Sequence, residues 1–271
     1  MNLWNRRGTG IKDRHGNVLL SGGGTLKDLL RESTRDDLYL AGAVIEGTAA
    51  RQVDLIETVL SNVNLANSFL EHVDLTNTSI NHCRFSGAKM SNLMLDFASF
   101  TDATLNDVSL MASSMQSAFI TCCDLSGAFW HDLSGSSLRI HESKARKLVI
   151  TGSSLPEIVI FGCLLSGLNI EGSRLEGMRV EYSVVDTTEF RELTASNGTF
   201  LANRLLDVDF IECDLSGVRF DSTTMVNVRF KKCEMDGIVF ARCDFFDVAS
   251  DVPVDSKRML QCKGEIQGAT Q

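Results

Sequence analysis

The sequence has very little proline and no long apolar run. Only two prolines occur among its 271 residues. Pro156 follows a large apolar residue at an expected corner, where a missing N–H is easily tolerated. No stretch of about 18 apolar residues is available to span a bilayer. The N-terminus has no apolar run after its first bases, so no conventional signal peptide is visible. The expected location is the cytoplasm, and export by a secretion system stays open because such signals have no fixed pattern.

Motifs for catalysis, cofactors and metals are missing as well. GxGxxG is absent, and the glycines at 22–24 predict a turn, not a phosphate-binding loop. None of the five histidines has metal-ligand spacing with cysteine or carboxylate, and there is no CxxC pair. No nucleophile motif accompanies them. The sequence therefore predicts no enzyme, no cofactor and no metal site.

What the sequence does have is a period of five. Taking every fifth residue from Leu40 to Phe245 gives 42 positions, here called central positions, and 38 of them hold Leu, Ile, Val, Met, Phe or Trp. Two residues earlier lies the inner small position, which holds Ala, Ser, Thr, Cys or Val in 30 of 42 units. Neither a helix nor an ordinary strand produces this pattern, whereas a short fixed period is typical of a solenoid. The four exceptions at central positions are Ala50, Gly135, Ala145 and Ala195.

The period predicts a four-sided coil. In an extended segment alternate residues share a face, so the central and inner small residues would both point inward. Four pentapeptides would close one square coil, and successive coils would stack about 4.8 Å apart. The expected fold is all-β, a four-sided solenoid with about ten coils.

Several units carry a sharper motif. They read Val63-Asn64-Leu65-Ala66-Asn67, Cys123-Asp124-Leu125-Ser126-Gly127 and Cys213-Asp214-Leu215-Ser216-Gly217. This motif resembles the pentapeptide repeat family, whose members form right-handed quadrilateral β-helices. The resemblance covers about residues 38–247 and implies the same fold, but its residues build a core and indicate little about activity. Two departures, Leu133-Ser134-Gly135 and Leu193-Thr194-Ala195, are interpreted as compensating volume swaps.

The expected organisation has three parts. Residues 1–37 would form an N-terminal cap, with a hairpin over 11–20 and a helix from Thr25 to about Ser33. The helix face formed by Leu26, Leu29 and Leu30 would cover the open edge of the first coil. Residues 38–247 would form the β-helix, and residues 248–271 a C-terminal tail or cap.

Two residue types mark the interior. Six of the eight cysteines fall on inner small positions and are interpreted as small buried side chains, which favours a reducing compartment. Phenylalanines recur at every second central position near the C-terminal end, and those one coil apart should stack. The expected ladders are Phe190, Phe210, Phe230 and Phe200, Phe220, Phe240, and the buried cysteines are Cys83, Cys123, Cys163, Cys213, Cys233 and Cys243.

Residues 128–150 are the least regular part of the repeat and suggest an interaction surface. One hypothesis is a bulge that presents basic and aromatic side chains to an acidic partner. The alternative is a locally repacked coil with ordinary solvated charges. The candidate residues are Trp130, His131, Arg139, Lys144, Arg146 and Lys147.

The last coil lacks an obvious strong cap. Either the tail folds back on it, or two copies meet end to end in a homodimer. The candidate contact residues are Phe245, Phe246, Met259 and Leu260.

Charge leaves two hypotheses for function. The net charge is −9, and residues 38–130 hold nine acids against three bases, so direct nucleic-acid binding is not expected. The first hypothesis is a protein-interaction scaffold, such as a bacterial accessory factor or an exported effector. The second follows from the family resemblance: an acidic, DNA-mimicking protein that binds DNA gyrase. The expected partner in both cases is another protein.

Overall fold

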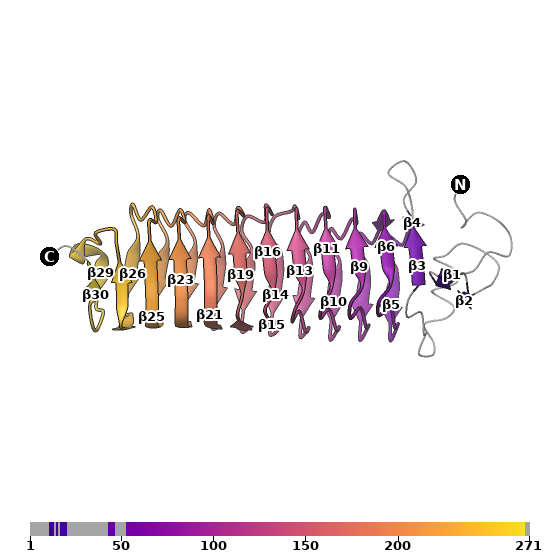
Figure 1. Cartoon of the computed structure of the whole chain (residues 1–271), viewed down its shortest axis with the longest axis horizontal. Helices are drawn as coiled ribbons and strands as arrows, with labels where there is room; N and C mark the ends of the chain where they lie inside the picture. The colour runs from indigo at the N-terminus through magenta and orange to yellow at the C-terminus, as the bar shows by residue number, and fades with distance from the viewer. Residues whose placement is uncertain (1–10, 14, 16, 21–42, 47–52, 269–271) are drawn as a thin grey trace. The chain divides into compact units, whose positions relative to one another are not determined.

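The computed structural model describes residues 11–13, 15, 17–20, 43–46 and 53–268. They belong to two compact units, unit 1 (Met1–Gly135) and unit 2 (Ser136–Gln271). Each unit is a parallel β-solenoid in which short strands stack on one another (Figure 1). The predicted all-β solenoid is confirmed.

Each regular coil consists of four pentapeptides. Ser79 lies beside Ser99, and Ser99 beside Phe119, in parallel register. The same step links Phe200 to Phe220 in unit 2. Backbone hydrogen bonds join successive coils, as from the N–H of Ser99 to the carbonyl of Thr78 at 2.9 Å. Four central positions therefore lie in each regular coil, one on each of four sides.

In unit 1 the sides are numbered in chain order from the one that contains Leu60. Side 2 consists of single bridges that link Asn64, Arg84, Thr104 and Asp124. Side 1 is formed by β5 (Val59–Ser61), β8 (Ser79–Asn81), β10 (Ser99–Thr101) and β12 (Phe119–Thr121). Side 3 is formed by β3 (Ala43–Glu46), β6 (Phe69–Glu71), β9 (Lys89–Ser91), β11 (Ser109–Met111) and β13 (Phe129–His131). Side 4 begins with β4 (Val53–Asp54) and β7 (Val73–Asp74) and continues as bridges.

Unit 2 repeats this arrangement. Side 1 is formed by β14 (Arg139–His141), β17 (Val159–Phe161), β20 (Arg179–Glu181), β22 (Thr199–Leu201), β24 (Arg219–Asp221), β26 (Val239–Ala241) and β29 (Met259–Leu260). Side 2 holds β15 (Lys144–Arg146), β18 (Leu164–Ser166) and β27 (Asp244–Phe246), and side 3 holds β16 (Val149–Thr151), β19 (Asn169–Glu171), β28 (Val248–Ser250) and β30 (Ile266–Gln267). Three longer strands run through sides 2 and 3: β21 (Val184–Arg191), β23 (Arg204–Ile211) and β25 (Thr224–Lys231). Side 4 consists of single bridges.

The core follows the period of five. Every central position from Leu55 to Phe245 is buried except Gly135, and every inner small position from Val53 to Cys243 is buried. The two expected phenylalanine ladders are present, with centroids 4.9 and 5.1 Å apart along one and 4.7 and 5.2 Å along the other. Rings of the two ladders also meet edge to face. The ring stacking adds about 0.5–1.5 kcal/mol per pair to the burial of apolar surface.

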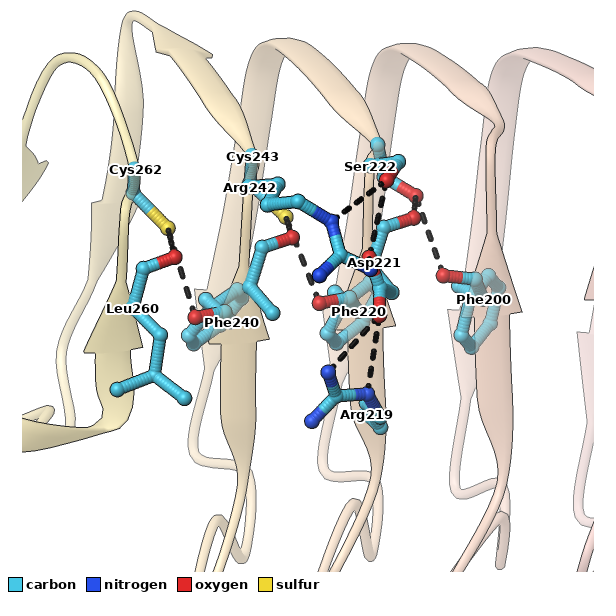
Figure 2. Close-up of polar contacts among 12 residues, drawn as sticks. Phe200, Arg219, Phe220, Asp221, Ser222, Phe240, Arg242, Cys243, Leu260 and Cys262 are labelled. Atoms are coloured by element: carbon cyan, nitrogen blue, oxygen red, sulfur yellow. Dashed lines mark hydrogen bonds and ion pairs between the residues drawn. The ribbon is translucent and has the colours of Figure 1, made fainter.

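Polar residues at inner small positions have a specific role. The side chain of Asn203 donates to the carbonyl of Val180 at 2.7 Å, and the hydroxyl of Thr223 donates to that of Phe200 at 3.2 Å. Thiols occupy the same place, since Cys243 Sγ lies 3.5 Å from the carbonyl of Phe220 (Figure 2). The inner cysteines are therefore buried, as predicted, and each also carries a donor that serves a backbone acceptor of the preceding coil.

The corners explain the Asp or Asn of the motif. Asn64, Asp124 and Asp214 each accept a hydrogen bond from the N–H two residues on, at 2.9–3.0 Å. These Asx turns close the corner after the central residue. Two residues beyond that central position the backbone turns left-handed, with φ of 56° at Asn67 and 71° at Gly127. Asparagine and glycine suit this conformation, as the sequence indicated.

Gly135 needs a different explanation from the expected volume swap. Its φ is +135°, and a Cβ there would lie 2.6 Å from the backbone N of Gln116. The backbone therefore requires glycine at this point, while the buried Leu133 fills the interior beside it. Leu193 and Ala195 are both buried, in agreement with a swap at that unit.

The N-terminal hairpin is present, and it contacts the first described coil. Strand β1 (Ile11–Asp13) pairs antiparallel with β2 (Val18–Leu20) and with β3. Strand β1 of this hairpin lies along the edge of β3. The helix predicted over 25–33 falls outside the described residues. Ile45 of β3 pairs with Leu70, whereas Leu70 pairs with Met90 in the regular step. The first coil therefore contains one pentapeptide more than four sides need.

The C-terminal segment continues the coil, although the period of five ends. Met259 pairs with Phe240 and Ile266 with Val248, so these coils are progressively shorter than four pentapeptides. Val254 and Ile266 are buried, and the 3-10 turn η2 (Ser256–Arg258) begins after the capping residue Asp255. Cys262 Sγ lies 3.5 Å from the carbonyl of Phe240 and repeats the inner hydrogen bond of earlier coils. This segment is an ordered turn stacked on the coil before it.

The cysteine environments predict selective thiol chemistry. Burial raises the pKa of Cys83, Cys123 and Cys163 to about 11 and that of Cys243 to about 12, whereas Cys122 is exposed and Cys262 half-buried. Only a thiolate reacts readily with a disulfide reagent. At mildly alkaline pH we expect fast labelling of Cys122 and Cys262 alone, and labelling of all eight thiols after denaturation. Mass spectrometry after timed labelling measures this, and rapid labelling of Cys83 in the folded protein would contradict it.

Candidate functional site

The candidate residues from 130 to 147 are divided between the two units and differ in exposure. Trp130 is only 2 % exposed, so its expected presentation to a partner is wrong. It occupies a central position on β13, and its ring fills the core of unit 1. His131 is exposed on the same strand, with its ring stacked 6.1 Å from that of Phe129.

The basic candidates lie in unit 2 and are divided between two sides. Arg139 begins β14 on side 1, whereas Lys144 and Arg146 belong to β15 on side 2. Lys147 follows at the corner, with φ of 54°. All four are exposed. The corner between β14 and β15 turns the chain, so these bases point away from different sides, and sequence proximity alone did not reveal that.

The C-terminal candidates also differ from one another. Phe245 is buried and meets the ring of Phe240 edge to face at 5.6 Å. Phe246 is exposed on side 2, and Leu260 is exposed on side 1. Met259 is half-buried where it pairs with Phe240. Contact with another copy through these residues stays a prediction.

Side 1 of unit 2 has an organisation that the sequence analysis missed. Its strands alternate between charged and uncharged first residues. Strands β14, β20 and β24 begin with Arg139, Arg179 and Arg219, whereas β17, β22 and β26 carry Val159, Thr199 and Val239 at the same place. Arg-x-Glu at 179–181 and Arg-x-Asp at 219–221 were the visible signal, two coils apart.

In the ion pairs of this side the acids are buried and the bases are exposed, whereas Glu142, at the corner after β14, is an exposed acid. The Arg179 side chain is 57 % exposed and its partner Glu181 only 11 %, and Arg219 is 43 % exposed beside Asp221 at 9 %. Arg242, on the following corner, also pairs with Asp221. We call the surface formed by Arg139, Arg179, Arg219, Arg242, Phe161 and Tyr182 the arginine face.

Asp221 organises its end of the arginine face (Figure 2). Its Oδ2 accepts from Arg219 Nε at 3.2 Å and from Nη2 at 2.8 Å. Its Oδ1 accepts from the hydroxyl of Ser222 at 2.9 Å and from Arg242 Nη2. Burial acts to raise the pKa of Asp221, but the hydrogen bonds from Arg219 and Ser222 and the charges of Arg242 and Arg219 outweigh it and lower that pKa.

Aromatic rings lie at the other end of this face. The rings of His141 and Phe161 are 5.6 Å apart, and those of Phe161 and Tyr182 are 5.4 Å apart. Tyr182 is 58 % exposed. The face therefore combines guanidinium groups with an accessible aromatic group on a flat sheet.

Side 4 has the opposite character in each unit. In unit 1 it carries acids and, between residues 53 and 135, no base. In unit 2, with the corner that follows each strand, it carries five acids and Arg174 as the one base between residues 154 and 237. The acids are Asp54, Glu57, Asp74 and Asp96 in unit 1 and Glu157, Glu176, Asp214, Glu234 and Asp236 in unit 2.

The stacked aspartates of side 4 have a structural role as hydrogen-bond acceptors at the corners. Asp54 lies beside Asp74, and Asp214 beside Glu234, as predicted. The three aspartates each accept a backbone N–H of their own corner. Within the described ranges, no group of three or more His, Cys, Asp or Glu side chains is arranged to hold a metal ion.

The five-residue period also matches a known family. The model for pentapeptide repeats matches residues 54–92 and 204–241, in eight copies. These stretches lie in separate units, and both show the inward pairs and Asx corners described above. The chain contains pentapeptide repeats.

The solved structures that match this chain share little sequence with it. HetL, a pentapeptide repeat protein involved in heterocyst differentiation regulation from Nostoc sp. strain PCC 7120, is 14 % identical, with 78 % of this chain and 90 % of HetL covered and a TM-score of 0.41. QnrB1, a plasmid-mediated fluoroquinolone resistance protein, is 14 % identical over 84 % of this chain and 89 % of its own, with a TM-score of 0.32. The A-module of the Azotobacter vinelandii mannuronan C-5 epimerase AlgE4 is 12 % identical over 89 % and 93 %, with a TM-score of 0.33. No curated protein matches the sequence.

Among the residues described, no helix has the length and apolar character needed to cross a membrane.

The ion pairs of Asp221 predict a pH-dependent stability. Asp221→Asn keeps the side-chain shape but removes the charge that two arginines face, so we expect it to lower the free energy of unfolding at neutral pH by about 1.5–3 kcal/mol. Because the folded-state pKa is lowered, this stabilisation is fully present above the unfolded pKa of about 3.9 and is lost as the pH falls through the folded-state value. Denaturant unfolding of both proteins from neutral to acidic pH measures the difference.

The matched control is Asp209→Asn, because Asp209 pairs with Lys231 on side 3 and its side chain is 35 % exposed, well above the value for Asp221. It should cost at most about 1 kcal/mol. A deficit of Asp221→Asn that grows on acidification would contradict the assignment.

Proposed function

We propose that this protein is a non-enzymatic scaffold that binds another protein through the outer side chains of its coils. The arginine face carries the proposal. Arginine and tyrosine are enriched among residues that contribute most to protein–protein binding. Here they project from a sheet whose backbone groups already bond to neighbouring coils, so the surface is held rigid before any partner arrives.

The acids and thiols of the described coils support a non-enzymatic role. Asp54, Asp74 and Asp214 serve their own corners, and the inner thiols serve backbone carbonyls. A catalytic site would require such groups to converge on a reacting atom. Here the acids and thiols recur at equivalent positions of successive coils, where they stabilise the backbone.

The acidity of side 4 favours a second candidate, a DNA-mimicking protein that binds DNA gyrase. Its carboxylates recur on stacked coils, so negative charge is spaced at the coil repeat, about 4.8 Å or a multiple of it. A protein that binds DNA phosphates by electrostatic attraction would be drawn to such a stripe.

Photocrosslinking tests the first candidate. Benzoylphenylalanine in place of Tyr182 should give one defined crosslinked product in cells of the source organism, because the arginine face contacts the partner. The control position is Leu164, which is 52 % exposed on side 2 of the same unit. Mass spectrometry identifies the product, and equal yields at the two positions would count against the proposal.

A supercoiling assay tests the second candidate. If side 4 competes with DNA, the protein should inhibit gyrase, and replacement of Asp214, Glu234 and Asp236 by Asn or Gln should weaken that inhibition. Product topoisomers are measured on agarose gels across a range of protein concentrations. Unchanged supercoiling at several-fold molar excess over gyrase removes this candidate.

A further inference from the structure

Side 1 of unit 2 differs from side 3 in how deeply the acids of its ion pairs are buried. On side 3, Arg191 is 36 % exposed and its partner Glu189 44 %. Arg229 is 30 % exposed and Asp247, at a corner of the next coil, 62 %. Asp209, which pairs with Lys231 on the same side, is 35 % exposed, whereas on side 1 Glu181 and Asp221 are only 11 % and 9 % exposed. The arginine face therefore presents positive charge although its formal charges nearly cancel.

The exposed guanidinium groups are held in place but are not saturated. Arg219 donates to Asp221 through Nε and Nη2, and Arg242 donates to Ser222 through Nε and to Asp221 through Nη2. Each guanidinium has five N–H donors, so N–H groups remain beyond those that these bonds use. A guanidinium that is already oriented loses less entropy when it binds an oxyanion. Glu181 and Asp221 are therefore positioning residues.

The repeat sets the distance between these binding groups. Arg179 and Arg219 occupy the same place on strands two coils apart, with β22 between them. Two coil steps amount to about 10 Å. Phe161 ends β17, one coil before Arg179, and Tyr182 follows β20, the strand that holds Arg179. Their rings provide an apolar contact beside the charges. The spacing fits carboxylates two helical turns apart on one face of a helix, about 10.5 Å.

We propose that the arginine face binds an acidic polypeptide segment, with carboxylates on Arg179, Arg219 and Arg242 and an apolar side chain against Tyr182. This rests on the proposed scaffold function and names the chemistry of its partner. Charge decides against a nucleic acid. Double-stranded DNA carries one negative charge per about 1.7 Å, far more densely than carboxylates about 10.5 Å apart. The net charge of −9 and the five acids to one base on side 4 of this unit therefore repel a nucleic acid more strongly than a short acidic segment.

The direct test uses a fluorescein-labelled helical peptide with glutamates at every seventh position and leucines between them. Fluorescence anisotropy should show binding that weakens as ionic strength rises. Arg179→Gln combined with Arg219→Gln should weaken binding about tenfold or more, the loss expected for buried charged contacts. A scrambled peptide of the same composition should bind less well than the ordered one.

The matched control is Arg204→Gln, which removes an exposed arginine from side 2 of the same unit. It should leave the affinity within about twofold. No peptide binding to the natural protein, or an equal loss in the Arg204 variant, would overturn the proposal. Tighter binding of a DNA duplex than of the acidic peptide would overturn it as well.

A second variant covers the case in which the arginine double variant fails to fold. Tyr182→Asn touches no ion pair, and asparagine tolerates the φ of 51° at this corner. It should weaken peptide binding about fivefold or more while the protein stays folded, because within the protein it removes only the ring contact with Phe161. Unchanged affinity would contradict the role of Tyr182.

The crosslinking experiment separates this inference from the function on which it rests. A specific product at Tyr182 with no acidic-peptide binding would refute the carboxylate chemistry and leave the scaffold intact. Failure of both experiments would refute both. Peptide binding that depends on the arginines supports the inference on its own.

Discussion

The constraint on which the rest depends is the backbone hydrogen bonding between coils. The backbone N–H and C=O groups of each coil form hydrogen bonds with the coils on either side. Each residue must therefore stay in register with the residue one full coil away. The turn must therefore have the same length each time, and four pentapeptides is that length through most of both units. A side chain in one coil then lies beside the side chain at the equivalent position of the next, so residues that stack well can repeat from coil to coil. Phenylalanine ladders and inner hydrogen-bond ladders both follow from this single requirement.

The same constraint explains why polar residues occur inside so narrow a core. The inner small position points at a backbone carbonyl of the preceding coil, and Cys, Thr or Asn there supplies a donor. An apolar residue of similar size, such as Val208, fills the position equally well where burial alone is needed. A buried polar atom without a partner would be costly, so these residues are favoured where the geometry satisfies them. The interior tolerates varied chemistry because the backbone, not the side chain, sets the spacing.

The sequence predicted those features that follow the pentapeptide period. The inward pairs, the corners with left-handed residues and the stacked phenylalanines all came from that period. A coil of five pentapeptides has the same five-residue period as a coil of four. The period therefore could not show that Ile45 pairs with Leu70, five pentapeptides away. It also could not tell that Trp130 fits inside, since a central position admits Leu and Trp alike. For the C-terminal segment the sequence left a folded-back tail and an end-to-end dimer as alternatives, because its shortened coils break the period while the pairing continues.

The arginine face lay beyond the sequence analysis for a different reason. The arginines that begin its strands recur only at every second coil, every 40 residues, and the five-residue period does not reveal so long a repeat. Even with Arg179 and Arg219 aligned, the sequence shows a balanced count of acids and bases, because it gives no burial. The structure separates them: a short carboxylate at the end of a strand lies beneath its neighbours, whereas a long arginine reaches solvent. Net charge therefore determines the long-range electrostatic interaction of the protein. The exposure of each charged side chain determines which charges a bound partner contacts. An acidic chain can in this way repel polyanions in solution and still offer a positive surface to a polypeptide that comes close.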